Sequence, residues 1–283
     1  MKLLKKKKIN IDFIGFHGQT IFHNAKEKIS KQLGSGKLLL KHTNKTVIYD
    51  FRQNDIKNGG QGAPLTPIFH NLLKKYFKIK NVIFVNIGGI VNTTTLLSDG
   101  SMSGTDIGPG MCLIDRWIRQ KSKKKFDENG IIAKSGKINK IVLEKFLKNF
   151  YEKEIILKPN TIKSFDTKYF DFTFVKDLSL EDGAATLTEF TAQIIISFLK
   201  STHFYGEEII LCGGGRKNNF LVDKLKKENH HIKLIDEYGV DGDFIESQAF
   251  AYLATRSYLG LPISFPKTTG VNKPCTGGVL LKV

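Results

Sequence analysis

Cysteine is scarce in this sequence, with three residues among 283. Cys112, Cys212 and Cys275 are far apart and form no C-x-x-C pair, so neither a disulfide framework nor a zinc site is predicted. Long apolar runs are also missing, because none approaches the ~20 residues that span a bilayer. The lysine-rich start has too short an apolar stretch behind it for a signal peptide. We therefore predict a cytoplasmic protein that binds no membrane.

Arginine is the second scarce residue: the sequence holds five, although lysine and arginine together number 44 and the net charge is +17. Such a charge suits a nucleic-acid partner. Base and phosphate recognition relies on the guanidinium fork, however, and no basic stripe alternates with aromatic residues here. We interpret the lysines as solvated faces and predict no nucleic-acid partner. A basic α/β protein that binds nucleic acid remains an open alternative.

Strands that alternate with helices predict an α/β fold, and the chain length allows two lobes. The predicted strands cover 9–16, 46–51, 81–85, 92–97, 208–212 and 232–236. The predicted helices cover 64–77, 109–121, 138–150, 181–203, 218–228 and 243–258. Ser179, three residues before Asp182, is predicted to cap the long helix. The Lys/Gly/Ser-rich region 122–137 is the best candidate for a mobile loop.

Five glycine-rich turns end a predicted strand or open a predicted helix, at 15–20, 59–62, 86–92, 104–110 and 212–215. Each alone is a weak signal, because α/β folds need glycine at tight strand exits. Together they are informative, since ligands in such folds gather at the carboxyl ends of strands. Glycine there lets backbone N–H groups approach phosphate or sugar closely.

Three polar residues in or near these turns have two interpretations each. Asp106 precedes a predicted turn and a helix whose first amides would be exposed, and it is either a functional carboxylate or a helix cap. His17, between glycines, is either a hydrogen-bonded turn residue or part of a site. Glu246 follows Asp243 by three residues at a predicted helix start, where a capping role competes with a functional one.

The glycine turns belong to a longer series of blocks that resembles one family. The chain is similar to the anhydro-N-acetylmuramic acid kinases in GFHGQT (15–20), YDFR (49–52), GGQGAPL (59–65), NIGGIVN (86–92), TDIGPG (105–110), EDGAATLTEFTA (181–192), CGGG (212–215) and VDGDFIESQAFAYLA (240–254). The blocks occur in the family's order with similar gaps and cover essentially the whole chain. Such a series is more specific than any single glycine turn.

The resemblance implies a two-lobed actin-like ATPase fold of the sugar-kinase type, with residues 1–80 as the remainder of an incomplete first lobe. Residues 81–283 would form the second, nucleotide-binding lobe, and the extreme C-terminus could return to the first. The family uses ATP to open 1,6-anhydro-N-acetylmuramic acid by hydrolysis and to phosphorylate O6. The product is N-acetylmuramic acid 6-phosphate, in peptidoglycan recycling. Mg²⁺ is expected with ATP, since phosphoryl transfer needs that charge neutralised.

The resemblance also implies roles for individual residues. Asp106 would be the general base that takes a proton from the attacking water. The expected nucleotide contacts are Asn86, Gly88, Gly89, Asn92, Gly108, Gly110, Gly213, Gly214 and Gly215. The expected sugar contacts are His17, Gln19 and Glu246. No metal ligand is predicted among the side chains, and a homodimer is one oligomeric state open to the chain.

The sequence departs from the family pattern in two respects. It contains no M-S-G-T-S-x-D-G segment, which forms the first phosphate-binding hairpin in the family, so we expect poor turnover from the 283-residue chain alone. Ile107 and Met111 stand where the family usually has threonine and asparagine, which removes polar groups near Asp106. A short family member that binds sugar or nucleotide without catalysis is therefore a second open alternative.

Overall fold

The computed structural model describes residues 10–152, 165–202 and 207–283, which form two compact units. Unit 1 consists of residues 1–73 and 246–283, and unit 2 of residues 74–245. The sequence prediction had drawn its boundary between residues 80 and 81. Each unit combines helices with a sheet that contains parallel strands, so the α/β class is confirmed.

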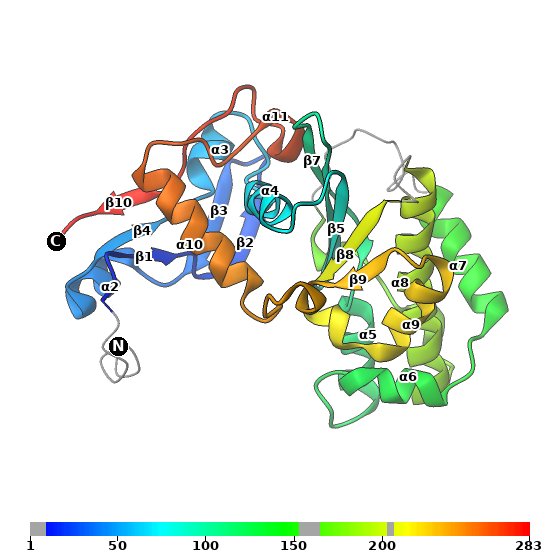
Figure 1. Ribbon diagram of the computed structural model, residues 1–283. Coiled ribbons are helices and arrows are strands. Elements are labelled where there is room, and N and C mark those ends of the chain that lie inside the picture. The colour runs from blue at the N-terminus through cyan, green and yellow to red at the C-terminus, as the bar shows by residue number, and fades with distance from the viewer. Residues whose placement is uncertain (1–9, 153–164, 203–206) are drawn as a thin grey trace. The chain divides into compact units, whose positions relative to one another are not determined.

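Unit 2 is built on a five-stranded sheet in the order β7-β6-β5-β8-β9 (Figure 1). Strands β5 (Val82–Ile87), β6 (Ile90–Leu96) and β7 (Met102–Pro109) are antiparallel neighbours. Strands β8 (Glu208–Cys212) and β9 (Ile232–Leu234) continue the sheet parallel to β5. The predicted strand at 208–212 is confirmed, and the strands predicted at 81–85 and 92–97 correspond to β5 and β6, which pair with each other.

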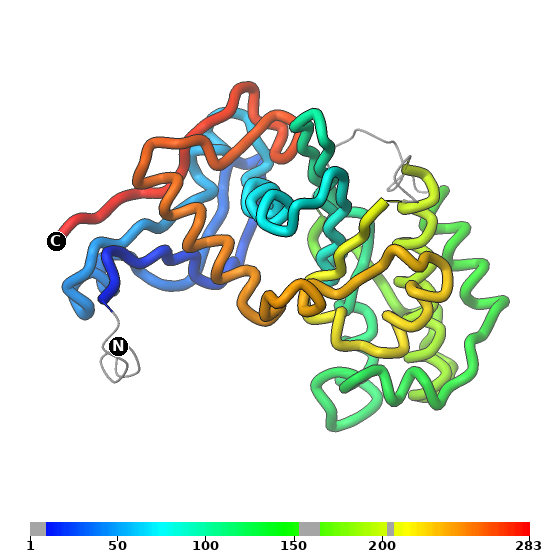
Figure 2. The backbone as a smooth tube through the Cα atoms, in the orientation of Figure 1, coloured from blue at the N-terminus to red at the C-terminus, as the bar shows by residue number. Residues whose placement is uncertain are grey.

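The helices of unit 2 gather on one side of this sheet (Figures 1 and 2). They are α5 (Cys112–Lys121), α6 (Ile131–Ser135), α7 (Lys140–Glu152), α8 (Leu180–Ser201) and α9 (Asn219–Glu228). The long helix α8 begins as predicted, since the Ser179 hydroxyl accepts the Asp182 N–H at 3.0 Å. Leu187, Phe190 and Ile194 of α8 join the core beneath the sheet, and this burial holds the helix in place.

Within the described residues of unit 2, five short 3₁₀ helices accompany these elements: η1 (Glu128–Gly130), η2 (Thr167–Tyr169), η3 (Thr173–Val175), η4 (Gly214–Lys217) and η5 (Ile235–Tyr238). Two of the elements, η1 and α6, occupy the region 122–137, which the sequence had indicated as a loop. Asp127 explains this difference, because its carboxylate is 3% exposed. It accepts the backbone N–H groups of Ile132 at 2.8 Å and Ala133 at 2.9 Å.

Unit 1 has a three-stranded sheet in the order β1-β4-β10. Strand β1 (Phe13–Phe16) is parallel to β4 (Thr46–Tyr49), and β10 (Val279–Leu281) is antiparallel to β4. A separate antiparallel ribbon joins β2 (Gln19–Asn24) to β3 (Ile29–Leu33). The helices are α2 (Gly36–Thr43), α3 (Gln53–Lys57), α4 (Pro67–Tyr76), which continues into unit 2, α10 (Ile245–Tyr258) and α11 (Pro266–Thr269).

Helix α10 packs directly on β1. A Cβ atom on Gly15 would lie 2.8 Å from the Phe250 carbonyl oxygen, so only glycine allows this approach. The Phe13 and Tyr258 rings stack at 5.5 Å between centroids. The first glycine turn therefore lies where β1 ends, beside the residues of α10.

Candidate functional site

Unit 2 brings Asp106, Asn92 and Asn86 into one row across three strands. Asn86 of β5 is opposite Asn92 of β6, and Asn92 is opposite Asp106 of β7. Directly opposed residues of neighbouring strands project from the same face of a sheet. Val85 and Ile87, on either side of Asn86, belong to the core beneath the helices. The polar row therefore lies on the face of the sheet opposite that core.

Asp106 lies within strand β7 and not at a helix start. The N-cap position of α5 is Met111, which makes no side-chain capping bond. The interpretation of Asp106 as a helix cap is therefore wrong. Its Oδ2 atom instead accepts the backbone N–H of Phe165 at 2.7 Å. The capping interpretation failed because the chain around Asp106 continues as strand β7, paired with β6, up to Pro109. Helix α5 begins only at Cys112.

The turn between β5 and β6 is bonded to the start of α5. The Gly110 N–H donates to the Gly89 carbonyl at 2.9 Å, and the Met111 N–H donates to the Gly88 carbonyl at 2.8 Å. The Cys112 N–H also donates to Gly89, at 3.2 Å. The prediction that the first amides of this helix are exposed is therefore wrong. These bonds fix the 88–89 turn against the helix.

Gly108 and Gly110 both have packing reasons to be glycine. A Cβ on Gly108 would lie 3.0 Å from the Phe150 ring and 3.1 Å from Ile194. A Cβ on Gly110 would collide with the Gly88 carbonyl oxygen. Their assignment to nucleotide binding stays a prediction.

The triple-glycine turn follows β8, next to the polar row. A Cβ on Gly213 would lie 2.6 Å from Asn86 Oδ1, and Gly213 has a φ of 77°. Gly215 is closely packed on Ile87, whereas a Cβ on Gly214 would have no atom within 4 Å. The turn thus has two glycines that the fold requires and one whose side-chain direction is open.

Arg216 anchors this turn to the chain before α10. It is 4% exposed, and its Nε and Nη2 atoms donate to the two Asp236 oxygens at 2.7 and 3.2 Å. It also donates to Asp243 at 2.9 Å and to the Gly213 carbonyl at 3.1 Å. The hydrogen bond from Arg216 lowers the pKa of Asp236. The carboxylate of Asp243, which the sequence suggested as a helix cap together with Glu246, therefore accepts a hydrogen bond from Arg216.

Unit 1 places His17 in a polar cluster at the end of β1. Its ring stacks on Phe250 at 3.9 Å between centroids. The Arg52 Nη2 atom lies 3.1 Å from His17 Nε2, and Arg52 Nη1 donates to the Gly62 carbonyl at 2.7 Å. Burial and the Arg52 guanidinium lower the pKa of His17 to about 3. The ring is therefore neutral and accepts at Nε2, which puts its proton on Nδ1.

The His17 Nδ1 atom is buried and has no hydrogen-bond partner within the part of unit 1 that the structure describes. A buried N–H without a partner costs free energy, and a ligand acceptor would remove that cost. Gln19 begins β2 two residues later and is exposed. Glu246 is exposed in the first turn of α10. The structure therefore puts the three expected sugar contacts in unit 1 and the nucleotide contacts with Asp106 in unit 2.

The glycine turn at 59–62 is held by residues to which the sequence analysis had assigned no role. The carboxylate of Asp55, which is 0% exposed, accepts the Gly62 N–H and the Thr269 hydroxyl, each at 2.5 Å. His23 Nε2 lies 2.8 Å from the Gln61 carbonyl. The YDFR and GGQGAPL blocks could have indicated a cluster at this turn. The contributions of His23 and Thr269 could not be predicted, because these residues come near the turn only in the folded chain.

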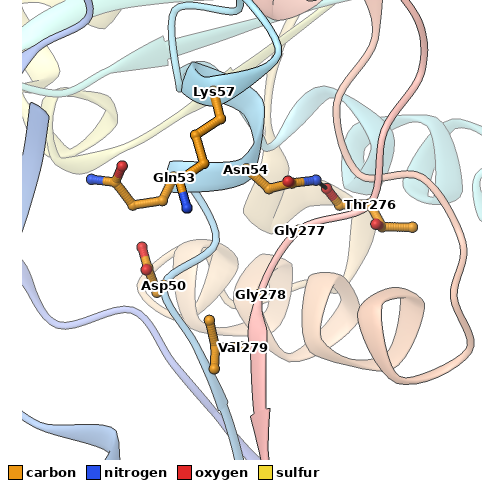
Figure 3. A pocket seen from close by; sticks show the side chains of 8 residues that line it. All are labelled: Asp50, Gln53, Asn54, Lys57, Thr276, Gly277, Gly278 and Val279. Carbon is orange, nitrogen blue, oxygen red and sulfur yellow. Dashed lines mark hydrogen bonds between the residues drawn. The ribbon is translucent and has the colours of Figure 1, made fainter. Parts of the chain in front are cut away.

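Figure 3 shows a further polar pocket of unit 1, about 290 Å³ in volume, beside the end of β4. Its lining consists of Asp50, Gln53, Asn54, Lys57, Thr276, Gly277, Gly278 and Val279. Asn54 Nδ2 donates to the Thr276 carbonyl at 2.6 Å across it. None of the expected site residues lines this pocket.

Two features are absent from the described residues. No helix there has both the length and the apolar character needed to cross a bilayer. Nor does that part of the chain hold a group of three or more His, Cys, Asp or Glu residues able to bind a metal ion.

The chain is similar to proteins of one named family along its whole length. A protein from Pelagibacter ubique, named anhydro-N-acetylmuramic acid kinase, is 51% identical over 291 residues, covering 99% of this chain and 76% of that protein. Proteins of the same name from Brucella canis and Methylobacterium nodulans are each 40% identical, covering 95% of this chain and 73% and 71% of their own lengths.

Among solved structures, the activator of 2-hydroxyisocaproyl-CoA dehydratase from Clostridium difficile with bound ADPNP aligns at a TM-score of 0.38 and 15% identity. The alignment covers 64% of this chain and 63% of that one, a likeness too slight to support an argument. The family model of anhydro-N-acetylmuramic acid kinase matches residues 1–282. The chain belongs to the anhydro-N-acetylmuramic acid kinase family.

Proposed function

We propose that this chain is an ATP-dependent kinase that opens 1,6-anhydro-N-acetylmuramic acid by hydrolysis and transfers the γ-phosphate of ATP to O6. The products would be N-acetylmuramic acid 6-phosphate and ADP. Family membership supports the activity. The observation that carries the site is the row of Asp106, Asn92 and Asn86, with two glycine turns beside it.

Asp106 is the carboxylate best suited to be the general base. In this role it takes a proton from water as the water oxygen bonds to the anomeric carbon and the bond from that carbon to O6 breaks. O6 then attacks the γ-phosphate, and ADP leaves. A base needs a fixed position near its proton donor, and strand β7 with the Phe165 N–H supplies such a position.

The nucleotide would be held by the two glycine turns. The side-chain direction of Gly214 is open, which leaves room for a flat ring over the backbone. Gly88 and Gly89 would face the phosphates, because backbone at a tight turn approaches phosphate closely. Mg²⁺ would accompany ATP and neutralise the charge on its phosphates.

His17, Gln19 and Glu246 remain the proposed sugar contacts. The N–H at His17 Nδ1 supports this, since it suits a sugar oxygen and finds no acceptor in the described part of unit 1. A cytoplasmic location fits the pathway that the family name implies. The homodimer stays a prediction.

The test compares Asp106→Asn with the parent and with Asp177→Asn, which changes an exposed aspartate in the same unit. Asparagine keeps the shape of the side chain and an oxygen for the Phe165 N–H, but it accepts no proton at neutral pH. We expect the rate of ADP formation with the anhydro sugar to fall about 10²–10⁴-fold. Sugar affinity should change little, because the lost interaction belongs to the transition state.

The assays use this chain alone and also joined to the part of the Pelagibacter ubique relative that lies outside the match. Turnover of about 1–100 s⁻¹ is expected from an active form. Asp106 is not the base if Asp106→Asn stays within a few-fold of the parent. If neither form phosphorylates the anhydro sugar, the proposed function is wrong.

A further inference from the structure

One short segment of unit 2 contacts both the proposed base and the proposed phosphate turn. This segment, residues 165–170, is called the bridging segment below. Its Phe165 N–H donates to Asp106 Oδ2 at 2.7 Å. Two residues further on, Thr167 Cγ2 lies 3.6 Å from the point that a Cβ on Gly89 would occupy. The bridging segment therefore links two positions that are far apart in the sequence.

Local hydrogen bonds fix the backbone of the bridging segment. The Asp166 carboxylate accepts the Lys168 N–H at 3.0 Å, and the Asp166 carbonyl accepts the Tyr169 N–H at 3.0 Å. The Phe165 and Phe170 rings meet edge to face at 5.5 Å between centroids. Because the chain is folded back on itself, the N–H of Phe165 is held in place by more than its bond to Asp106.

Arg116 of α5 anchors the far end of the bridging segment. Its Nη1 atom donates to the Phe170 carbonyl at 2.9 Å, and its guanidinium lies 4.9 Å from the centre of the Phe172 ring. Phe170 itself is 4% exposed. A planar guanidinium can donate along its edge while its face stacks on a ring, which a lysine ammonium cannot do.

We propose that Phe165, held in place by Arg116 through the bridging segment, positions Asp106 for proton abstraction; this rests on the proposed function. The Phe165 N–H restrains the Oδ2 end of the carboxylate and favours its charged form, the form that accepts a proton. The backbone of Phe165 and the side chain of Arg116 are positioning groups, because neither needs to contact the sugar. Displacement of a catalytic group by about 1 Å can cost about 10²-fold in rate.

The first experiment removes only the N–H. Phe165→Pro deletes the donor, and Phe165→Leu keeps it while changing the ring. For Phe165→Pro, kcat should fall about 10–10²-fold while KM changes little. The acidic limb of its pH–rate profile should move to higher pH, since the charged carboxylate loses a hydrogen bond. Phe165→Leu should keep the parental profile and a kcat within a few-fold of the parent.

The second experiment removes the anchor. Arg116→Gln should reproduce the lower kcat and the moved acidic limb, and Arg116→Lys should recover only part of the loss. Arg119→Gln is the matched control, because Arg119 lies on the same helix and donates to the Lys125 carbonyl outside the bridging segment. It should keep the parental profile. These variants also decide the question if Phe165→Pro fails to fold.

The two proposals fail in different ways. If Asp106→Asn keeps its activity, the assignment of the base is wrong. If Asp106→Asn is inactive but Phe165→Pro and Arg116→Gln keep the parental profile, the positioning role alone is overturned. For a chain without turnover, the ¹³C carboxyl signal of Asp106, identified by its loss in Asp106→Asn, gives the answer. It should titrate at higher pH in Phe165→Pro or Arg116→Gln than in the controls, and equal titrations overturn the inference.

Discussion

Asp115 on α5 carries a carboxyl group that is poorly solvated. Its Oδ1 atom is buried and has no hydrogen-bond partner among the described residues. Burial, opposed by Arg119 and reinforced by the nearby Asp127, raises the pKa of Asp115 from 3.8 to about 6. The folded chain therefore binds this proton more tightly than the unfolded chain. The group's contribution to stability is greatest below pH 4, declines as the pH rises towards 6, and stays low above that.

Because the contribution of Asp115 to folding stability declines as the pH rises, Asp115→Asn should stabilise the fold relative to the parent increasingly with pH. A shift from 3.8 to about 6 corresponds to at most about 3 kcal/mol. The side chain is partly exposed, so solvent screening reduces this to roughly 1–2 kcal/mol. The free energy of unfolding of Asp115→Asn, relative to the parent, should rise by that amount between pH 4 and pH 7. The thermal midpoint should gain about 2–4 °C for each kcal/mol.

Urea unfolding at half-unit steps from pH 4 to pH 8 measures this difference. Asparagine places an NH₂ donor in the same environment, so a constant offset between variant and parent is compatible with the argument. Only the slope against pH tests the carboxyl group. Asp177→Asn, which removes an exposed carboxylate, serves as the control. A flat difference for Asp115→Asn, or one that falls as the pH rises, would refute the reasoning.

Two further predictions concern the proposed ligand contacts. The pKa of His17 is lowered to about 3, so its ring signals in NMR spectra should not titrate between pH 5 and 8. Because the unfolded chain takes up that proton below about pH 6.5, His17 should make the fold less stable as the pH falls from there, and His17→Gln should lessen that loss. Gly214→Val should keep the parental thermal midpoint, since its side-chain direction is open, and should weaken nucleotide binding but not sugar binding in calorimetric titrations. Equal loss of both ligands would mean that the turn has only a structural role.

The sequence predicted elements best where the hydrophobic period was long or the strand buried. β8 was predicted to the residue, and the long helix predicted at 181–203 is α8, whose Leu187, Phe190 and Ile194 are buried. The ribbon of β2 and β3 was not predicted, because its sequence shows little alternation between apolar and polar residues. Its outward side chains include the exposed Phe22 and Leu33. Its inward residues are polar, since His23 binds both Ser30 and the Gln61 carbonyl.

The glycine turns of the candidate site could be located from the sequence, but the contacts that hold them could not. Glycine spacing identified the turns, yet nothing in the sequence connects Asp106 with Phe165, 59 positions away. Asp55 and Thr269 are separated by 214 positions, and their contact also exists only in the folded chain. Long-range contacts of this kind leave no local pattern in the sequence. The sequence could therefore suggest candidate site residues, but not the distant residues that hold them in place.

The departures from the family pattern beside Asp106 have a different meaning once the fold is known. Ile107 is 2% exposed and belongs to the hydrophobic core of unit 2. Met111 packs against the same core, and its N–H donates to the Gly88 carbonyl. Because the Ile107 and Met111 side chains join the core, the view that they remove polar groups from around Asp106 is wrong. Asp106 shares its face of the sheet with Asn92, directly opposite it, and with Asn86, opposite Asn92. This row keeps the polar character that the proposed chemistry needs.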